Sequence, residues 1–492
     1  MQQKQSNEIN NPILYTSVLL VGIFFILYTI LSQGKALLLD EFIMLITAKR
    51  PIVESLLQTQ DYSAPFYQLL LRLFIWNNHP SPLVLRIPAA FAAALCLFIS
   101  WQLVQKTLNT SLSLAFIILL GLNPFFIDWA TMARPYTFYG LFFMCCMILA
   151  CDIIDSYSDK KTLYFILSSI LLGYTTFIGI PITILMVSLI TILLPHRHNA
   201  IRFLKWNLLT LFCLFPVFFL LFRYIAEGLP ALYGGWIRKP TFIYFITGTR
   251  FSDFFGDLYT GGIFFSFFII ALTIFAHNFY LYSKNKTDIK QNYYLIKDFN
   301  KQRTLWFLIL IFILSLSYLI NACSLYFPIY TDRYAFPVVI LLLLCFILII
   351  DNFPLVSRIA FLLIVCILYL PHIQQTFFDK RNSIIYAGLR VNNMLSDNKP
   401  VYLVNWKHGT DWTSPEYYGL KYYGFKVQEC KFIDLNYGNS DGSIKDDAFL
   451  KESPHAAILV YGNMRNIFAD FFNKRHIAFK RESISDYTLF YY

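Results

Sequence analysis

Long apolar runs alternate with short polar segments along the first three quarters of the chain. The first run covers residues 12–32, and similar runs recur as far as residue 370. A helix of about 20 apolar residues crosses the hydrocarbon core of a bilayer. Helices and closed barrels are the structures that satisfy their own backbone polar groups there. The pattern therefore predicts an all-α, polytopic membrane protein.

These runs give about 11 predicted transmembrane helices, with the N-terminus in the cytoplasm and the C-terminus outside. The fourth starts near Arg134 and returns by Asp152, and the tenth follows Tyr334 and returns by Asp351. The polar segments that separate the fifth span from the sixth and the tenth from the eleventh are weak. The number of spans is therefore open by one pair. The other spans are predicted at residues 12–32, 82–104, 112–127, 163–178, 180–194, 203–224, 262–282, 305–322 and 359–370.

Charged residues between the spans orient the chain, because cytoplasmic loops of membrane proteins are enriched in lysine and arginine. The net charge of +11 fits this bias and contact with anionic lipid, so it does not indicate nucleic-acid binding. Asp40, Asp128 and Asp332 fall on the opposite, external side. The basic loops lie at residues 106, 160–161, 196–205, 284–303 and 358.

The segment between the first two spans, residues 34–80, has an intermediate polarity. Two stretches in it, 36–49 and 64–76, have a helical period but are too short or too charged to span a membrane. We expect interfacial helices there, with their charged side chains in water or among lipid headgroups.

Beyond Pro371 the chain becomes far more polar. This change predicts a transmembrane domain over residues 1–372 and an external domain over residues 373–492. Strand and helix patterns alternate in the second domain, as in a small α/β fold. A lid, a docking module and a second catalytic centre are all compatible with it. Strands are predicted at residues 401–405, 455–461, 476–480 and 487–491, and helices at 414–423 and 464–474.

An acidic pair follows the first span directly. Asp40 and Glu41 are adjacent, and Asp61 lies in the same external loop. One carboxylate of such a pair can take a proton from an acceptor hydroxyl while its neighbour orients the base or binds a metal. The alternative is the solvated flank that many membrane spans carry.

Two further external loops carry charged and aromatic residues, and we expect the three loops to meet in one cavity. An arginine at the membrane boundary can hold a phosphate through two hydrogen bonds while its stem stays in apolar surroundings. The alternative is an arginine that reaches only the headgroups. The residues in question are Asp128, Arg134, Tyr136, Asp332, Arg333 and Tyr334.

Arg86 lies inside the second span and needs a carboxylate partner, for which we expect an acid of the first loop. A purely structural ion pair is the alternative. The histidines and the nine cysteines have no clear ligand spacing. The sequence therefore identifies no certain cofactor and leaves a divalent metal open. Most of the many tyrosines and phenylalanines are expected to face lipid.

Five short motifs occur in order along the chain. They are Asp40-Glu41, Pro65-Phe66-Tyr67, Leu85-Arg86-Ile87-Pro88, Asn123-Pro124 with Ala133-Arg134-Pro135-Tyr136, and Asp332-Arg333-Tyr334. In this combination the chain resembles the GT-C superfamily of membrane glycosyltransferases. The nearest branch is bacterial and similar to protein O-mannosyltransferases and lipid A aminoarabinose transferases.

The resemblance implies a polyprenyl-phosphate sugar donor, inverting transfer, and an active site on the external side of the bacterial inner membrane. By position, Asp40 matches the base that deprotonates the acceptor, and Glu41 matches its partner. Asp61, Arg86, Asp128 and Asp332 are expected to support the site. Contacts to the donor phosphate are expected at Arg134, Tyr136, Arg333 and Tyr334.

The chain departs from the family pattern in two places. Ser63-Ala64-Pro65 stands where relatives often have His-Pro-Pro or Asp-Pro-Pro. Thr131-Met132-Ala133-Arg134 lacks the glutamate of the family's Gln-Glu-Ala-Arg, which puts any family metal site in doubt. Asp128, one helical turn earlier, is the candidate substitute.

These inferences predict an integral-membrane glycosyltransferase whose partners are the lipid-linked donor, an external acceptor and membrane lipids. Two alternatives stay open. A non-enzymatic lipid or polysaccharide transporter would need charged groups deep in several spans, and we find few. A polysaccharide ligase or polymerase would use a similar donor but transfer a longer chain.

Overall fold

In the computed structural model, contacts between Cα atoms divide the chain into two compact units. The first holds residues 1–32, 86–222 and 239–378, and the second holds residues 33–85, 223–238 and 379–492. The structure describes residues 11–33, 35–57, 64–75, 80–226, 266, 269–270, 272–273, 276, 305–316, 334, 336–351, 353–378, 383–397, 399–408, 411–413, 415–426, 428, 430–435, 456–461, 464–474, 476–484 and 487–491.

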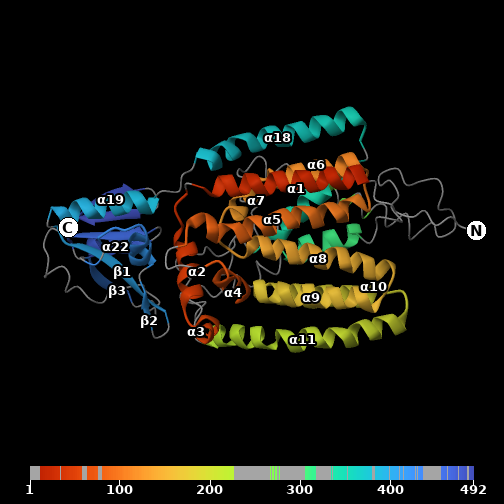
Figure 1. Ribbon diagram of the computed structural model, residues 1–492, viewed down its shortest axis with the longest axis horizontal. Coiled ribbons are helices and arrows are strands. Elements are labelled where there is room, and N and C mark those ends of the chain that lie inside the picture. The colour runs from red at the N-terminus through yellow and green to blue at the C-terminus, as the bar shows by residue number, and fades with distance from the viewer. Residues whose placement is uncertain are drawn as a thin grey trace, which may run out of the picture. The chain divides into compact units, whose positions relative to one another are not determined.

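The first unit is a bundle of long helices (Figure 1). Most predicted spans are confirmed as helices with nearly the predicted bounds, whereas the eighth, 262–282, falls largely outside the described residues. The helices are α1 (Asn11–Ser32), α5 (Pro82–Gln105), α6 (Thr110–Gly121), α7 (Pro124–Ala130), α8 (Tyr136–Asp155), α9 (Asp159–Thr175), α10 (Gly179–Leu193), α11 (Arg197–Ala226), Leu305–Leu316, α17 (Phe336–Ile350) and α18 (Leu355–Phe378).

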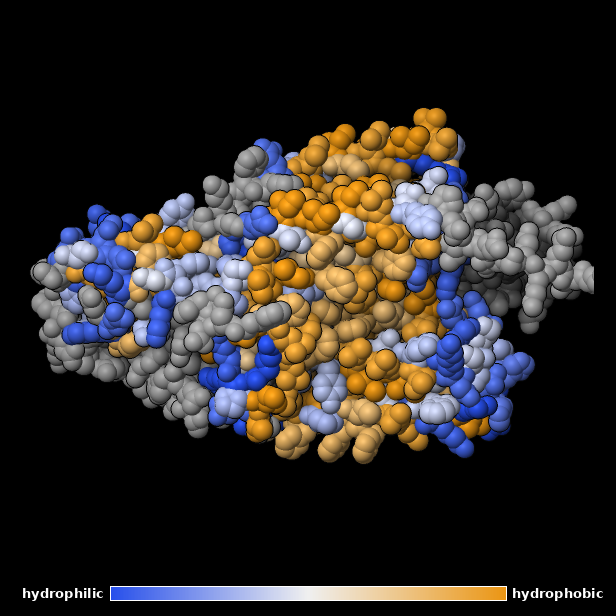
Figure 2. Space-filling model, viewed as in Figure 1, coloured by the Kyte–Doolittle hydropathy of each residue, from blue (hydrophilic) through white to orange (hydrophobic). Residues whose placement is uncertain are grey.

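The helices of this unit have the composition of membrane spans. Four of the described helices are long and apolar enough to cross a bilayer, or five if the bent pair α6 and α7 is one span. Figure 2 shows apolar residues spread over the middle of the helices and hydrophilic residues gathered at their ends. The chain is therefore a multi-pass membrane protein, while the total of about 11 spans stays a prediction.

Helix α17 lies at the centre of this packing, since every one of its side chains is buried. A helix that is apolar on all sides belongs inside a bundle. It packs closely on α8 at Gly140, where an added Cβ would lie 2.4 Å from Phe336 Cε1. This close approach sets the first turn of α17 beside the first turns of α8.

The predicted span over residues 112–127 is not one continuous helix, because the helix breaks after Gly121. Helices α6 and α7 meet at an angle of 64°. The Asn123 side chain accepts a hydrogen bond from the Phe126 N–H at 3.0 Å and caps α7. Pro124 occupies the first turn of α7, where its missing N–H costs nothing. A capping residue followed by proline is typical of a helix start. The uninterrupted apolar pattern gave no sign that a new helix begins here.

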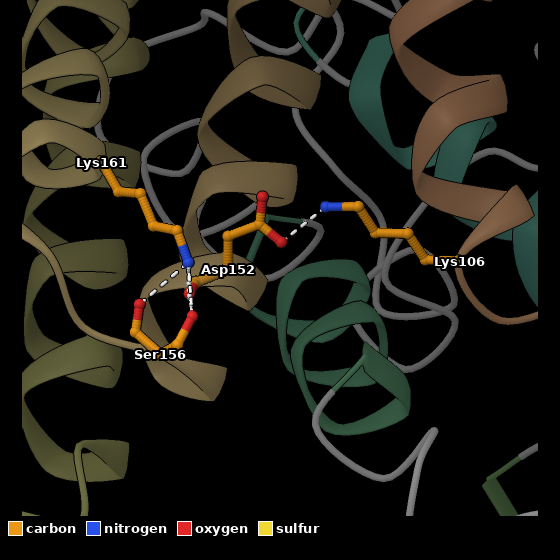
Figure 3. A network of polar contacts seen from close by, with 4 residues as sticks. All are labelled: Lys106, Asp152, Ser156 and Lys161. Atoms are coloured by element: carbon orange, nitrogen blue, oxygen red, sulfur yellow. Dashed lines mark hydrogen bonds and ion pairs between the residues drawn. The ribbon is translucent and has the colours of Figure 1, made fainter. Parts of the chain in front are cut away.

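Three loops of the first unit meet at one end of the bundle. The Lys106 ammonium lies 2.5 Å from the Asp152 carboxylate. Lys161 donates to the Asp152 carbonyl at 2.8 Å and to the Ser156 hydroxyl at 2.5 Å (Figure 3). Arg202 of α11 pairs at this end with a carboxylate of α9. Basic residues from three predicted cytoplasmic loops thus share one end, as the predicted orientation requires.

The second unit begins with short helices between α1 and α5. Two of them were expected, and the third, over residues 52–57, was not. The Arg72 guanidinium donates to the Arg50 carbonyl, which ties the last of these helices to the turn after the first. The helices are α2 (Leu39–Lys49), α3 (Ile52–Leu57) and α4 (Phe66–Arg72).

The rest of the second unit is a mixed sheet with helices. The strand order is β2-β1-β4-β6-β5, and β3 also pairs with β1. Strand β1 runs parallel to β3 and β4, and the other pairs are antiparallel. The elements are α19 (Ser383–Ser396), β1 (Val401–His408), β2 (Asp411–Thr413), α20 (Pro415–Tyr422), β3 (Lys431–Leu435), β4 (Ala457–Tyr461), α22 (Met464–Lys474), β5 (Lys480–Ile484) and β6 (Tyr487–Tyr491).

The strand predicted at residues 476–480 is wrong, because a helix end occupies part of it. His476 has a left-handed backbone with φ of 55°. The next N–H, of Ile477, donates to the Phe472 carbonyl at 3.0 Å and closes α22. This arrangement is a Schellman motif, so β5 begins only at Lys480. The helices and the other three strands predicted in this domain are confirmed, and α19, β2 and β3 were not predicted.

Candidate functional site

The predicted site residues are divided between the two units. Their expected meeting in one external cavity stays a prediction. Asp61, Asp332 and Arg333 lie outside the described residues. The first unit contains Arg86, Asp128, Arg134, Tyr136 and Tyr334, and the second contains Asp40 and Glu41.

Arg134 and Tyr136 form the best-defined polar pair in the first unit. The Arg134 side chain is buried, with 2% of its surface exposed. One of its amino groups donates a hydrogen bond to the Tyr136 hydroxyl at 3.2 Å. The guanidinium carbon also lies 5.6 Å from the centre of the Tyr136 ring, within reach of a cation–π interaction. The pair therefore holds a positive charge against a polarisable ring, away from water.

Aromatic side chains surround Tyr136. The Trp129 ring meets it edge-on at 4.5 Å between centroids, and the Tyr334 ring does so at 6.3 Å. The Tyr139 hydroxyl donates to the Tyr334 carbonyl at 3.2 Å. These contacts link α7, α8 and the residue two before α17. Two residues predicted from separate loops, Tyr136 and Tyr334, are thus brought together.

Local sequence explains how Arg134 comes to this place. Helix α7 ends at Ala130, and the Thr131 hydroxyl donates to the Asp128 carbonyl at 3.2 Å. The Arg134 N–H then donates to the Met132 carbonyl in a tight turn. Pro135 follows as the N-cap of α8. The arginine therefore occupies the turn between two helices, next to the positive end of the α8 dipole.

Asp40 and Glu41 occupy the first turn of α2 in the second unit. Glu41 is buried, with 1% of its surface exposed, whereas Asp40 is half-buried. The Glu41 carboxylate accepts a hydrogen bond from the Leu38 N–H at 2.8 Å. Negative charge is favoured at a helix N-terminus. The acidic pair thus sits where α2 stabilises its charge, with Asp40 the more accessible of the two.

Arg86 closes the end of α1. Its side chain is fully buried, and it donates to the Ser32 carbonyl at 3.1 Å. The last carbonyls of a helix lack partners inside the helix, and a cation is favoured there. Arg86 thus has a structural contact, and its pairing with an acid of the first loop stays a prediction.

Among the described residues, no group of three or more histidine, cysteine, aspartate or glutamate side chains is placed to hold a metal ion. Asp128, the candidate substitute ligand, is half-buried in α7. Its role in a metal site stays a prediction.

Three aromatic residues in these contacts were not singled out from the sequence. Trp129 packs against the Tyr136 ring, and Tyr139 donates a hydrogen bond to the Tyr334 carbonyl. Tyr139 follows Tyr136 by three positions, so both face one side of α8, a signal the sequence does carry. For Tyr423, whose hydroxyl accepts a hydrogen bond from the Leu37 N–H at 2.8 Å, the sequence carries no such signal, because the two residues are 386 positions apart.

Neither a protein-family model nor a curated protein matches the sequence. Among solved structures, the chain is similar to the crystal structure of ArnT from Cupriavidus metallidurans bound to undecaprenyl phosphate. The TM-score is 0.52 at 10% sequence identity, over 96% of this chain and 97% of that chain. The chain has the ArnT fold.

The apo crystal structure of ArnT from the same organism is also similar, with a TM-score of 0.45 at 11% identity over the same shares of both chains. The first of these two structures confirms the resemblance to the aminoarabinose transferase branch, as a resemblance of fold.

Proposed function

We propose that this ArnT-like protein transfers a sugar from a polyprenyl-phosphate donor to an external acceptor, with inversion at the sugar. The buried pair of Arg134 and Tyr136 carries the proposal. It supplies a desolvated cation in a fold whose ArnT relative was crystallised with undecaprenyl phosphate. The acceptor class is a lipid, a glycan or a protein.

Arg134 is assigned to the donor phosphate. A guanidinium loses its hydration when it is buried, and an anion compensates for that loss better than a neutral group. Each hydrogen bond to a charged phosphate contributes about 1.5–3 kcal/mol. Because only 2% of Arg134 is exposed, binding requires neighbouring side chains to move aside. We assign this movement to Tyr136, its hydrogen-bond partner, and to the aromatic rings packed on Tyr136. Tyr136 and Tyr334 are assigned to the same phosphate, together with Arg333.

Asp40 is assigned as the base. It takes the proton of the acceptor hydroxyl, and the hydroxyl oxygen attacks the anomeric carbon of the sugar. The bond from that carbon to the phosphate oxygen breaks, and the lipid phosphate leaves with the electron pair. A phosphate leaving group needs stabilisation of its charge more than a proton, and arginine supplies it. Glu41 is assigned to orient this base.

The remaining predicted residues have supporting roles in the proposal. Asp61 adds a carboxylate to the loop that carries Asp40 and Glu41, and Asp332 adds one directly before Arg333. Asp128 lies in α7, one helical turn before the turn that carries Arg134. Arg86 fixes the end of α1, from which the acidic segment departs. The reaction uses no nucleotide, which suits a site on the external side of the bacterial inner membrane.

The proposal is tested with purified protein in lipid nanodiscs and undecaprenyl-phosphate-linked sugars. We expect label to move to an acceptor, and we expect Asp40→Asn to reduce the rate by about a hundredfold or more. An Asp40→Asn variant with full activity removes the catalytic assignment. Movement of the intact donor across the bilayer without transfer establishes a transporter instead. Addition of many sugars to one acceptor, seen by mass, establishes a polymerase or ligase.

A further inference from the structure

The C-terminal end of helix α20 and the residue after it contact the segment that leads into the acidic pair. The Tyr423 hydroxyl accepts a hydrogen bond from the Leu37 N–H at 2.8 Å. The next N–H, of Leu38, donates to Glu41 at 2.8 Å. Two consecutive N–H groups just before Asp40 are therefore held by side chains, one of them from the far end of the chain.

Aromatic packing supports this hydrogen bond. Phe42, the second residue after Asp40, has 1% of its surface exposed. Its ring meets Tyr422 at 5.5 Å and Tyr423 at 6.2 Å, both edge-on. Gly419 allows this approach, since an added Cβ would lie 2.9 Å from Phe42 Cε2 and 2.3 Å from Ile384 Cδ1. Residues on both sides of Asp40 are thus held by α20 and by Tyr423, which directly follows it.

The end of α20 is itself fixed to the C-terminal domain. Gly424 has a φ of 79°, and the Phe425 N–H donates to the Leu420 carbonyl at 3.1 Å. This is a Schellman motif, which suits a glycine in the left-handed region. Phe425 packs on α19, where a Cβ on Gly388 would lie 2.2 Å from its ring. Packing and hydrogen bonds on its C-terminal side therefore fix Tyr423. A residue that positions another side chain needs to be fixed in this way.

From this geometry we infer that Tyr423 is a positioning residue for Asp40, so that the C-terminal domain aligns the base of the transferase. The inference rests on the proposed function. Without the hydroxyl, the buried Leu37 N–H loses this acceptor and the start of α2 shifts to find another. A shift of about 1 Å at a reacting group can cost a hundredfold in rate. In this inference the C-terminal domain aligns α2, the helix that carries Asp40 and Glu41.

The test is Tyr423→Phe, which removes the hydroxyl and keeps the ring against Phe42. Tyr417→Phe is the matched control, because it makes the same change within α20, the helix that Tyr423 directly follows, and its ring packs on Phe432. For Tyr423→Phe we expect a kcat about tenfold to a hundredfold lower and an unchanged KM for the lipid-linked donor. Hydrogen exchange at the Leu37 and Leu38 amides should become faster. Tyr417→Phe should leave all three quantities unchanged.

Each other outcome has a separate meaning. Unchanged exchange at Leu37 and Leu38 in Tyr423→Phe overturns the inference, whatever the rate. Faster exchange with an unchanged kcat also overturns it, while an inactive Asp40→Asn leaves the proposed function standing. A raised donor KM with an unchanged kcat assigns Tyr423 to binding and overturns the positioning role. A fully active Asp40→Asn removes the proposed function and this inference together.

Discussion

The Glu41 carboxylate accepts a hydrogen bond from the Leu38 N–H, 2.8 Å away, across the first turn of α2. This contact resembles half of a capping box, in which an acid in the first turn reaches back to the residue before the helix. Glu41 thus has a structural task, while Asp40, beside it, is the more exposed carboxylate. The two members of the acidic pair should respond differently to substitution.

We expect Glu41→Ala to lower the free energy of unfolding of the second unit by about 1 kcal/mol, because the Leu38 N–H loses its acceptor. Glu41→Gln should cost less, since its amide oxygen can still accept. Asp40→Asn should change the free energy of unfolding by no more than about 0.5 kcal/mol while it reduces the transfer rate by about a hundredfold or more. Thermal unfolding and transfer rates measured on the same preparations check this. Stability losses in the opposite order would reverse the two assignments.

Arg134→Lys should weaken the binding of undecaprenyl phosphate by about tenfold to a hundredfold, because lysine keeps the charge but loses the planar fork of donors. Tyr136→Phe should weaken it less, since the ring and the cation both remain. The dissociation constants can be measured by microscale thermophoresis in nanodiscs. Equal affinity in the wild type and Arg134→Lys would show that the phosphate binds elsewhere.

Undecaprenyl phosphate should also change the tryptophan fluorescence of the protein. Trp129 lies edge-on to Tyr136 at 4.5 Å, and the proposed binding requires this aromatic cluster to move. Trp129→Phe should abolish most of the change, and Trp101→Phe, at a buried position on α5, should retain it. A change of equal size in both variants would place the movement outside the cluster.

Gly140→Ala should destabilise the first unit by about 1–3 kcal/mol, because its Cβ would meet Phe336 at 2.4 Å and force α8 and α17 apart. Gly22→Ala in α1 is the control, since nothing beyond its chain neighbours and its own helix backbone lies within 4 Å of the added Cβ. Unfolding in mild detergent, followed by circular dichroism, compares the two. Equal stability of both variants would contradict the close packing of α8 on α17.

The second unit should lose stability in mild acid through Glu482. The Tyr491 hydroxyl at 2.5 Å, and then Arg390 at 2.9 Å, hold the pKa of Glu482 below its ordinary value of 4.5. A lowered folded pKa stabilises the fold above the ordinary pKa, and this contribution disappears as the pH falls through the lowered value.

Glu482→Gln should therefore flatten the decline of stability between about pH 5 and pH 3. The Glu482 and Arg390 side chains are 37% and 44% exposed, so the effect should stay below about 1 kcal/mol and shrink in high salt. Asp397→Asn, at a more exposed ion pair with Lys399, is the control. An identical dependence of stability on pH in the wild type and both variants would show that Glu482 makes no such contribution.

The apolar pattern was sufficient for most helices of the first unit, because burial in lipid or in a bundle requires long apolar runs. It failed at Gly121, where a cap and a proline break an apolar run without changing its hydrophobicity. It also misplaced a strand at His476, because a left-handed helix end is a property of the backbone that composition does not reveal.

The sequence by itself determined the membrane class, the bounds of most helices and the mixture of helices and strands near the C-terminus. These follow from periodicity, charge and local caps, which act over a few positions. The tertiary structure alone decided which residues touch. It placed Trp129 and Tyr334 around Tyr136 and set Tyr423 against Leu37 across 386 positions. Such contacts depend on how whole helices pack together, and this packing cannot be predicted from any single segment of the sequence.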